Sequence, residues 1–281
     1  MTAPHTTPQP ATPATPATAG ADAPLPLGRF VYHDLMTTDP AGARAFYSAL
    51  LGWTCAPRDV GGFEYTDVQT AGGRFGGMVP LDPAHGLPSH WTSYVAVDDV
   101  AAACARAEAA GGKVCVPPHD IPGGKGQFAV LNDPPGAMVS VVRFTDAFEP
   151  ARSDAPGGAW WHELLTHDVE KAAAFYAGAF GWEARPEMTL PDGSPYYLLY
   201  HAGQLVGGMM QAPPDLPVSA WQLYVTVDDV DAAVARAQAS GGTVTWPAMD
   251  VPDVGRMAGL ADPAGAMFAV GRAPATAGAA S

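Results

Sequence analysis

The fold is decided by a stretch that occurs twice, as FVYHDLMTTDPAGARAFYSALLGW at residues 30–53 and as AWWHELLTHDVEKAAAFYAGAFGW at residues 159–182. Two further blocks repeat at nearly the same offset. WTSYVAVDDVAAACARAEAAGG (91–112) returns at 221–242, and LNDPPGAM (131–138) returns at 260–267. Similarity in three separated blocks indicates duplication of a whole domain rather than of a short motif. The sequence therefore predicts two tandem copies of one fold.

A weaker repeat lies inside each copy. A short apolar run leads to Asp, an Ala-rich helical segment follows, and the helix ends at Gly. Asp39, Asp168 and an Asp of each Val-Asp-Asp-Val turn can accept hydrogen bonds from the first free helix amides. The glycines suit the left-handed residue that ends a helix; they are Gly52, Gly111, Gly181 and Gly241. Apolar runs broken by turn residues come next. The pattern predicts a strand, a helix and about three strands, four times along the chain.

Composition limits the possible partners. The chain has 281 residues, of which 48% are hydrophobic and 15% charged, so two cores can form. The formal net charge of −14 disfavours a nucleic-acid partner, because like charges repel the phosphate backbone. No stretch has the roughly 20 apolar residues that span a bilayer, so we expect no membrane partner.

The domain limits follow from the repeat and from composition. We expect domains at 27–146 and 158–272, a linker at 147–157, and disordered tails at 1–26 and 273–281. The first tail lacks the features of a signal peptide. Three cysteines with no metal-type spacing indicate reduced thiols that fill space in a cytoplasmic protein; they are Cys55, Cys104 and Cys115.

The organisation resembles the vicinal oxygen chelate superfamily, which includes glyoxalase I, extradiol dioxygenases and bleomycin- or fosfomycin-resistance proteins. The resemblance rests on the D-x6-FY-x4-GW blocks (39–53 and 168–182), the Val-Asp-Asp-Val turns and the D-P-x-G turns at 133–136 and 262–265. It implies an α+β fold of four βαβββ units that form two tandem domains with cup-shaped mixed sheets. It is specific for the fold and much less so for the reaction.

In this family the ligand lies on the concave face of each cup, and strand alternation decides which side chains reach it. Aromatic residues are frequent near the expected cups, at Trp91, Tyr196 and Trp221 among others, and Met78 and Met209 add apolar surface. The resemblance therefore implies an aromatic or apolar small molecule as ligand. The residues predicted to bind it are Tyr32, Asp34, Met36, Thr92, Tyr94, Met138, Ser140, Trp161, Glu163, Gln222, Tyr224 and Met267.

Metal-dependent relatives carry their ligands at strand positions that hold other residue types here. The corresponding residues are Tyr32, Thr92 and Ser140 in the first half and Trp161, Gln222 and Ala269 in the second. None is a histidine or a carboxylate, so we expect neither a metal nor another cofactor. The alternative is a metal site that includes His33 and His162, one residue away. A shift of one residue moves a side chain to the other face, so this alternative requires a different register.

Several functions stay open from the sequence alone. The first is a metal-free protein that sequesters a small molecule, as in resistance. The second is an enzyme, a glyoxalase-like lyase or a dioxygenase, either metal-dependent or with Asp34 or Glu163 as general base. A third is a scaffold for protein interaction. Two fused domains can imitate a symmetric dimer, so a monomer or a homodimer is expected. Whether each cup forms within one half or across both is also open.

Overall fold

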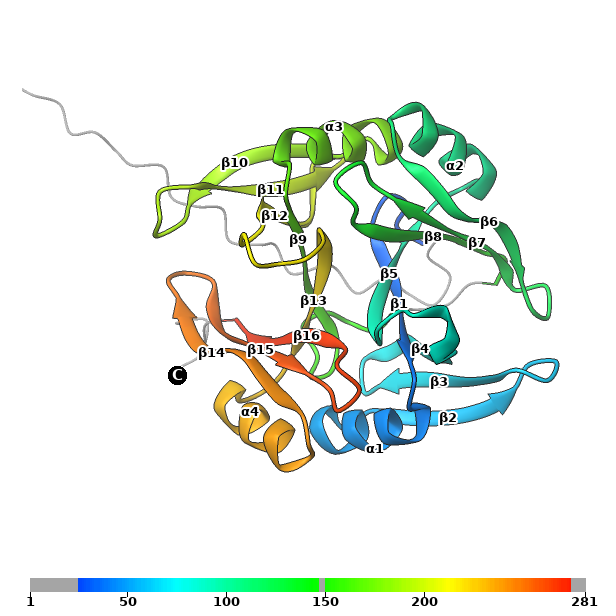
Figure 1. The fold of residues 1–281 in the computed structure, drawn as a ribbon, viewed down its shortest axis with the longest axis vertical. Helices are drawn as coiled ribbons and strands as arrows, with labels where there is room; N and C mark the ends of the chain where they lie inside the picture. The colour runs from blue at the N-terminus through cyan, green and yellow to red at the C-terminus, as the bar shows by residue number, and fades with distance from the viewer. Residues whose placement is uncertain (1–24, 147–149, 274–281) are drawn as a thin grey trace, which may run out of the picture.

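The computed structural model describes residues 25–146 and 150–273, and it has the predicted α+β architecture of four βαβββ units (Figure 1). The tails predicted at 1–26 and 273–281 lie outside these ranges except for Leu25, Pro26 and Ala273. Each half forms one eight-stranded mixed sheet, so both cups form within a half and not across the two.

The N-terminal sheet has the order β2-β3-β4-β1-β5-β8-β7-β6. Its pairs are antiparallel except for β1 with β4 and β5 with β8, which are parallel. The elements are β1 (Phe30–Thr37), α1 (Pro40–Leu51), β2 (Thr54–Asp59), β3 (Glu64–Thr70), β4 (Gly73–Pro80), a 3₁₀ turn η1 (Pro83–His85), β5 (His90–Ala96), α2 (Val100–Ala109), β6 (Lys113–Ile121), β7 (Gly126–Asn132) and β8 (Met138–Phe144).

The C-terminal sheet repeats this order as β10-β11-β12-β9-β13-β16-β15-β14. Its elements are β9 (Ala159–Thr166), α3 (Val169–Phe180), β10 (Glu183–Thr189), β11 (Pro195–His201), β12 (Gln204–Gln211), β13 (Ala220–Thr226), α4 (Val230–Ala239), β14 (Thr243–Val251), β15 (Gly255–Ala261) and β16 (Met267–Arg272). We use N-terminal cup and C-terminal cup for the concave faces of the two sheets.

The predicted helix signals are confirmed. The Asp39 carboxylate accepts a hydrogen bond from the Gly42 amide, and the other three helices have an Asp N-cap of the same kind. Helix α1 ends at Gly52 with φ of 70°, which favours glycine. These local signals fix where each helix starts relative to the strand before it. They therefore fix which strand residues lie under the helix and which face the cup.

All four edge strands contain proline. Pro57 lies in β2, Pro117 in β6, Pro186 in β10 and Pro247 in β14. Proline has no amide hydrogen to donate to a further strand, so it protects a sheet edge from pairing with another chain.

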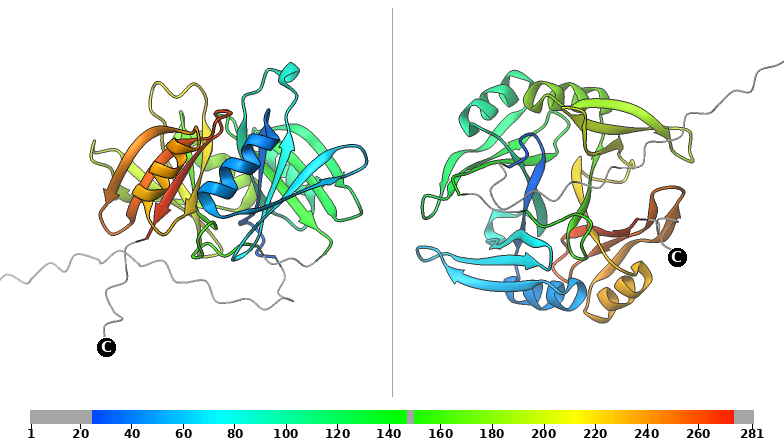
Figure 2. Two further views of the ribbon diagram at one scale, coloured as in Figure 1. Left: turned by 90° about the horizontal axis from the view of Figure 1, so that it is seen from below. Right: turned by 180° about the vertical axis from the view of Figure 1, so that it is seen from behind.

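The two domains pack through their convex sides, and their helices pair across the halves. Helix α1 lies beside α4, and α2 lies beside α3, as Figure 1 and Figure 2 show from different directions. The apolar core is divided in the same way. One core cluster joins residues of α1 and β4 to residues of α4, β15 and β16, and the other joins α2 and β8 to α3 and β12. Both cups consequently open away from the domain interface.

The Phe-Tyr pair of the first helix in each half is buried against the other half. The Tyr47 hydroxyl donates to Asp262 Oδ2 at 3.2 Å, and the Tyr176 hydroxyl donates to Asp133 Oδ2 at 3.1 Å. Each carboxylate belongs to a D-P-x-G turn of the opposite domain. Two motifs that are far apart in the sequence therefore meet at the domain interface.

Neighbouring groups complete this contact. The Trp91 indole donates to the Tyr47 hydroxyl at 3.0 Å. A Cβ on Gly242 would lie 2.8 Å from the Phe46 ring, so glycine is needed where that ring packs. Gly112 and Phe175 make the equivalent contact in the other direction. The halves are thus joined by two copies of one set of contacts.

Replacement of Tyr47 by phenylalanine tests this contact. The variant removes the tyrosine donor of Asp262 Oδ2, although Oδ1 still accepts from backbone amides, and it leaves the Trp91 indole without its acceptor. We therefore expect it to lower the free energy of unfolding by about 1–3 kcal/mol. Urea unfolding at pH 7 measures the difference. The matched control is Tyr200→Phe, because the Tyr200 hydroxyl donates to Glu187 at an exposed position. The control should change stability by less than about 0.5 kcal/mol. Equal losses of unfolding free energy in the two variants would show that the hydrogen bond between the domains stabilises the fold no more than an exposed one does.

Candidate functional site

Strand alternation places the predicted ligand-binding residues on the concave faces. In β1, Leu35 is in the core cluster under the helices, so Tyr32 and Asp34 point the other way. In β8, Val139 and Val141 are core residues, and Met138 and Ser140 face the cup. The same parity in β9, β13 and β16 turns the predicted residues of the second half to the C-terminal cup.

A buried carboxylate lies at the floor of the N-terminal cup. Asp34 is 6% exposed, and its Oδ1 accepts a hydrogen bond from the Tyr65 hydroxyl at 2.8 Å. The Tyr94 hydroxyl and the Gly77 amide also donate to this carboxylate. The Tyr32 hydroxyl lies 2.8 Å from that of Tyr65 and extends the network by one step. Three tyrosines from β1, β3 and β5 therefore surround one acid.

The C-terminal cup has the same cluster with altered residues. Glu163 is 9% exposed, and it accepts hydrogen bonds from the hydroxyls of Tyr196 at 2.8 Å and Tyr224 at 2.7 Å. The Trp161 indole donates to Tyr196 at 3.0 Å, at the position equivalent to Tyr32. Glu163 also pairs with Gly208 and Gln222 in the sheet register. The two cups thus share a carboxylate held by two tyrosine hydroxyls.

Two glycines make room for this cluster. A Cβ on Gly77 would lie 2.0 Å from the Tyr65 hydroxyl, and a Cβ on Gly208 would lie 2.0 Å from that of Tyr196. Any side chain there would push the tyrosine away from the acid. The Gly-Gly pairs in β4 and β12 lie beside a break in the strand register in both halves. These glycines and Tyr65 build the cup floors, and sequence reasoning missed them.

Burial changes the ionisation of both acids. Desolvation raises the pKa of Asp34 from 3.8 to about 6, although the hydrogen bonds from Tyr65 and Tyr94 lower it. Burial raises the pKa of Glu163 as well, against the hydrogen bonds from Tyr224 and Tyr196. Burial and the neighbouring carboxylates raise the pKa of the tyrosines well above 10. The hydroxyls consequently stay protonated and act as donors.

The positions that hold metal ligands in related folds have the wrong chemistry here. In the N-terminal cup Thr92 Oγ1 and Ser140 Oγ lie 3.0 Å apart and hydrogen-bond to each other. In the C-terminal cup Trp161 and Ala269 offer no ligand atom. Catalytic divalent metals such as zinc, iron and manganese require several imidazole or carboxylate ligands, and neutral hydroxyl groups do not replace these ligands. Within residues 25–146 and 150–273, no group of three or more His, Cys, Asp or Glu could hold a metal ion. These residues therefore do not fit a catalytic metal.

His33 and His162 lie on the convex side, at the domain interface. Their rings stack with centroids 5.0 Å apart, and the Phe30 ring stacks on His162 at 4.1 Å. His33 Nδ1 lies 3.1 Å from Ser93 Oγ. Burial lowers the pKa of His33 to about 3 and lowers that of His162 as well. Both rings are consequently neutral at pH 7 and pack between the sheets, on the face opposite to the cups.

Some sequence interpretations need correction. Trp91 and Trp221 do not line a cup, because their indoles donate to the buried tyrosines of the domain interface. Met78 and Met209 are also wrong as cup residues, since both are fully buried in the convex-side cores. Cys115 is exposed rather than a core filler. Met36 is half-buried, and Met138 and Met267 are 37% and 51% exposed, so these three residues lie away from the buried clusters.

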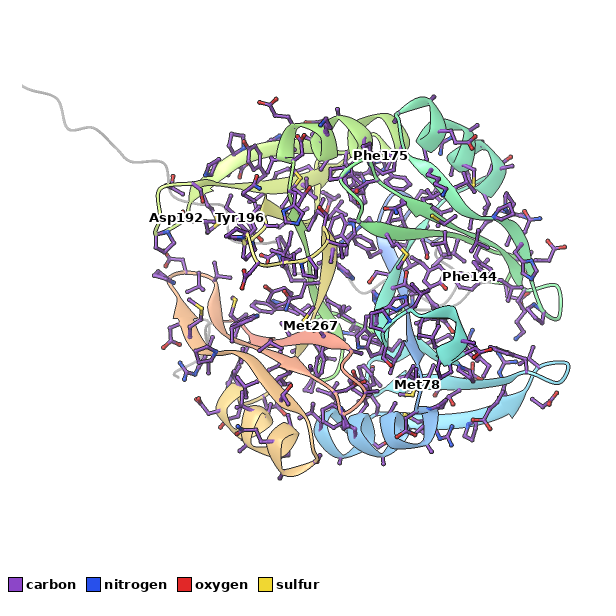
Figure 3. The ribbon with its side chains drawn as sticks, in the orientation of Figure 1. Met78, Phe144, Phe175, Asp192, Tyr196 and Met267 are labelled. Carbon is purple, nitrogen blue, oxygen red and sulfur yellow. The ribbon has the colours of Figure 1, made fainter. Side chains whose placement is uncertain are left out.

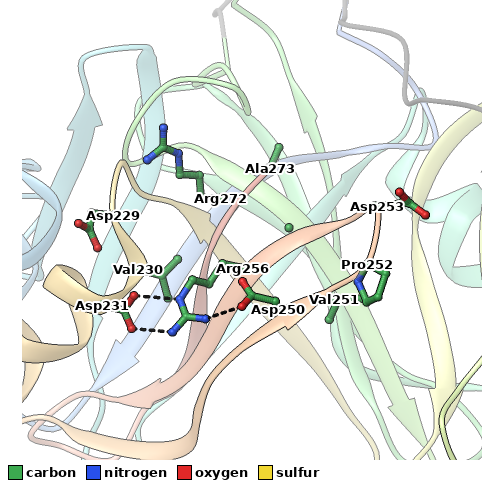
Figure 4. A pocket seen from close by; sticks show the side chains of 11 residues that line it. Asp229, Val230, Asp231, Asp250, Val251, Pro252, Asp253, Arg256, Arg272 and Ala273 are labelled. Atoms are coloured by element: carbon green, nitrogen blue, oxygen red, sulfur yellow. Dashed lines mark hydrogen bonds and ion pairs between the residues drawn. The ribbon is translucent and has the colours of Figure 1, made fainter. Parts of the chain in front are cut away.

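A hollow of about 520 Å³ lies outside the cups, between the start of α4 and the β14–β15 hairpin (Figure 4). Its central cation, Arg256, forms ion pairs with Asp231 at 2.8 Å and Asp250 at 2.9 Å. The arginine is thereby satisfied within the protein. The hollow is separate from the two carboxylate clusters. In the described part of the chain, no helix has the length and apolar character to cross a membrane.

Comparison with known families and proteins gives a consistent result. A model of the glyoxalase/bleomycin resistance protein/dioxygenase superfamily matches residues 28–141, and a glyoxalase-like domain model matches residues 159–271. "Putative glyoxylase CFP32" of Mycobacterium tuberculosis is 37% identical over 242 residues, which cover 84% of this chain and 92% of the relative. "Anthracycline biosynthesis protein DnrV" of Streptomyces peucetius is 34% identical over 260 residues, with 86% and 92% covered.

Solved structures with the same fold have much lower sequence identity. The Mn(II)-bound glyoxalase from Novosphingobium aromaticivorans superposes with a TM-score of 0.61 at 16% identity, covering 87% of this chain and 82% of its own. The 2,3-dioxygenase LapB from Pseudomonas sp. KL28 gives 0.61 at 13% identity, with 89% and 95% covered. These likenesses show a common fold with two tandem domains.

The raised pKa of Asp34 predicts how stability depends on pH. Because the pKa is higher in the folded protein, the contribution to stability is complete below pH 3.8 and is lost as pH rises through about 6. Two pKa units correspond to about 3 kcal/mol in total. Urea unfolding of the wild type and of Asp34→Asn, compared at pH 4 and pH 8, isolates this group from other titrations. We expect the wild type to lose about 2 kcal/mol more than the variant over this range. Parallel losses would mean that Asp34 titrates normally.

Proposed function

This chain belongs to the glyoxalase/bleomycin resistance protein/dioxygenase superfamily, and we propose that it binds small aromatic or apolar organic molecules in its cups. The observation that carries the proposal is the recurrence of one polar cluster at both cup floors. Asp34 and Glu163 are each held by two tyrosine hydroxyls. A buried acid costs folding free energy, so its presence at two equivalent concave positions favours a role in recognition.

The chemistry of the cluster suggests the kind of ligand. A carboxylate accepts hydrogen bonds and tyrosine hydroxyls donate them, so the floor can meet a hydroxyl or keto group at one edge of a ligand. Aromatic side chains beside the floor favour a ring system over an aliphatic chain. The net charge of −14 disfavours anions. A neutral or cationic aromatic molecule with oxygen substituents fits these three conditions.

The relatives add support from another direction. One is described as an anthracycline biosynthesis protein, and anthracyclines are fused-ring aromatic molecules with hydroxyl and keto groups. Holding or sequestering such a compound, as in resistance, is a role that the cups allow. We propose this role for the present chain, with the cup residues named above as the contact set.

Ligand binding can be tested directly with three probes, a hydroxyanthraquinone, a flavonol and a hydroxysteroid. Native mass spectrometry should detect one or two molecules of at least one probe per chain, with a dissociation constant of roughly 1–100 μM by calorimetry. Tyr196→Phe and Tyr65→Phe remove one donor from each floor and should weaken binding in the cup that is used by about fivefold or more. Tyr200→Phe serves as the matched control and should leave affinity unchanged. Failure of all three probes to bind at about 100 μM would contradict the proposal.

A second candidate function is metal-free enzymatic proton transfer. The observation that favours it is the pKa of Asp34 near 6, because a general base works best when its pKa is close to the operating pH. In such a reaction Asp34 takes a proton from the carbon beside a carbonyl group, and the electron pair moves to the carbonyl oxygen. When that first carbon bears a hydroxyl group, the hydroxyl proton moves to the former carbonyl oxygen and the first carbon becomes the new carbonyl. Return of the carbon-bound proton to the neighbouring carbon then completes an isomerisation without an oxidant or reductant.

Solvent exchange distinguishes this candidate from simple binding. The hemithioacetal of methylglyoxal and a thiol is incubated with the protein in D₂O containing a chelator, and deuterium incorporation is followed by NMR. A general base predicts a rate that rises with pH and levels off above about 6, and that is lost in Asp34→Asn. Asp250→Asn is the control, because this exposed acid of the other half pairs with Arg256. A rate equal to that of buffer alone would exclude the enzymatic candidate for this substrate.

A further inference from the structure

The two cups share a floor but have different walls, and we infer that the C-terminal cup is the one that takes a planar aromatic ligand. In this inference the ligand stacks on the Trp246 indole and bonds through an oxygen atom to Gln222. The inference rests on the proposed function and adds the cup, the shape of the ligand and the residues that select it.

The wall of the N-terminal cup is filled by its own apolar side chains. Val31 and Val142 are 3% and 1% exposed, and they belong to a cluster that includes Tyr32 and Tyr94. The Phe144 ring packs against Tyr32 with centroids 5.4 Å apart. Further members of this cluster cover it from outside; they are Leu25, Ile121 and Phe128. Apolar side chains of the protein therefore cover part of the concave surface beside Asp34.

The C-terminal cup replaces these aliphatic residues by tryptophan and glycine. Trp160 stands at the position of Val31, and Gly271 stands at that of Val142. A Cβ on Gly271 would lie 2.0 Å from the Trp160 ring, so the indole lies directly on the glycine backbone. Two neighbouring valines of the N-terminal cup therefore correspond to a tryptophan and a glycine in the C-terminal cup.

A second pair has changed in the same way. In the N-terminal cup Val116 pairs with Val130, whereas in the C-terminal cup Trp246 pairs with Gly259. A Cβ on Gly259 would lie 2.1 Å from Trp246 Nε1. Both indoles are half-buried and keep part of their surface open. Each indole lies on a glycine backbone, and the Tyr224 ring makes interplanar angles of 74° with Trp160 and 47° with Trp246. The two indoles therefore present separate apolar ring faces, where the other cup has valine side chains.

Tyr224 connects the two indoles to the floor. Its ring centroid lies 6.3 Å from that of Trp160 and 6.4 Å from that of Trp246, and its hydroxyl bonds to Glu163. Figure 3 labels Tyr196 of β11 and Met267 of β16, which lie on opposite sides of the central strands β9 and β13 in the C-terminal sheet. Flat aromatic surfaces favour stacking with a planar ring and gain little from a puckered one.

The two cups also differ in whether the polar side chains beside the floor hydrogen-bond to each other. In the N-terminal cup the hydroxyls of Thr92 and Ser140 satisfy each other. In the C-terminal cup the equivalent residues are Gln222 and Ala269, and a methyl group cannot bond to the amide. The half-buried Gln222 side chain makes no hydrogen bond with any residue in 25–146 or 150–273. The amide is therefore available to an oxygen substituent on the ligand.

The inference is tested with 1,8-dihydroxyanthraquinone as planar probe and a saturated hydroxysteroid of similar size as non-planar probe. Calorimetry should give one site per chain for the planar probe and an affinity at least about tenfold above that of the steroid. Trp246→Leu should weaken binding of the planar probe by about fivefold or more, and Gln222→Met by a similar factor. The matched control Val116→Leu changes the equivalent position of the N-terminal cup and should alter affinity by less than about twofold.

Gly259→Val gives the C-terminal cup the residue of its N-terminal counterpart. It should abolish binding of the planar probe, and circular dichroism checks that the variant folds; if it does not fold, Trp246→Leu carries the test. Unchanged affinity in Trp246→Leu together with weaker binding in Phe128→Leu would overturn the inference and leave the proposed function intact. Tighter binding of the steroid than of the anthraquinone would do the same. Absence of binding by every probe would instead overturn the proposed function.

Discussion

The burial of each Phe-Tyr pair in the opposite domain is the constraint on which the rest of the structure depends. Phe46 needs Gly242 beneath its ring, and Tyr47 needs the carboxylate of Asp262. These contacts draw α1 against α4 and turn the convex sides of both sheets toward one another. The concave sides are then left to face outward. The positions of both cups therefore follow from an interface in which no cup residue takes part.

The cup floors carry the free-energy cost of burying a carboxylate, as do Asp133 and Asp262 at the domain interface. Ionised Asp34 is destabilised by burial, and only donors that stay protonated can offset this without adding charge. Tyrosine meets that requirement because burial beside a carboxylate raises its pKa further. Glycine at positions 77 and 208 is the steric condition for the arrangement. Carboxylate, tyrosine and glycine thus form one unit, and the unit is present in both domains.

The sequence predicted the fold because its signals are local or repeated. Asp caps and strand parity are enough to predict that Asp34 and Glu163 lie on the concave face. Tyr65 was missed because the offset to Tyr196 is 131 rather than 129, so a loop change hides the match. Trp91 was misplaced because aromatic character alone does not indicate a face. Its indole bonds to Tyr47, which itself bonds to the second domain, and such a chain of contacts exists only in the folded protein.

In a duplicated chain, residues of the domain interface are less free to be replaced than residues of the cups. Each half supplies the Phe-Tyr pair to the other and receives the other's pair, so loss of a motif in one half leaves a buried group unsatisfied in both. Each cup, in contrast, is built from the strands of one half. Residues of its walls can therefore be replaced without a change at the domain interface. Equivalent wall positions hold Val130 in the N-terminal cup and Gly259 in the C-terminal cup. A fused pair of this kind can keep one scaffold and one polar floor while its two cups acquire different shapes.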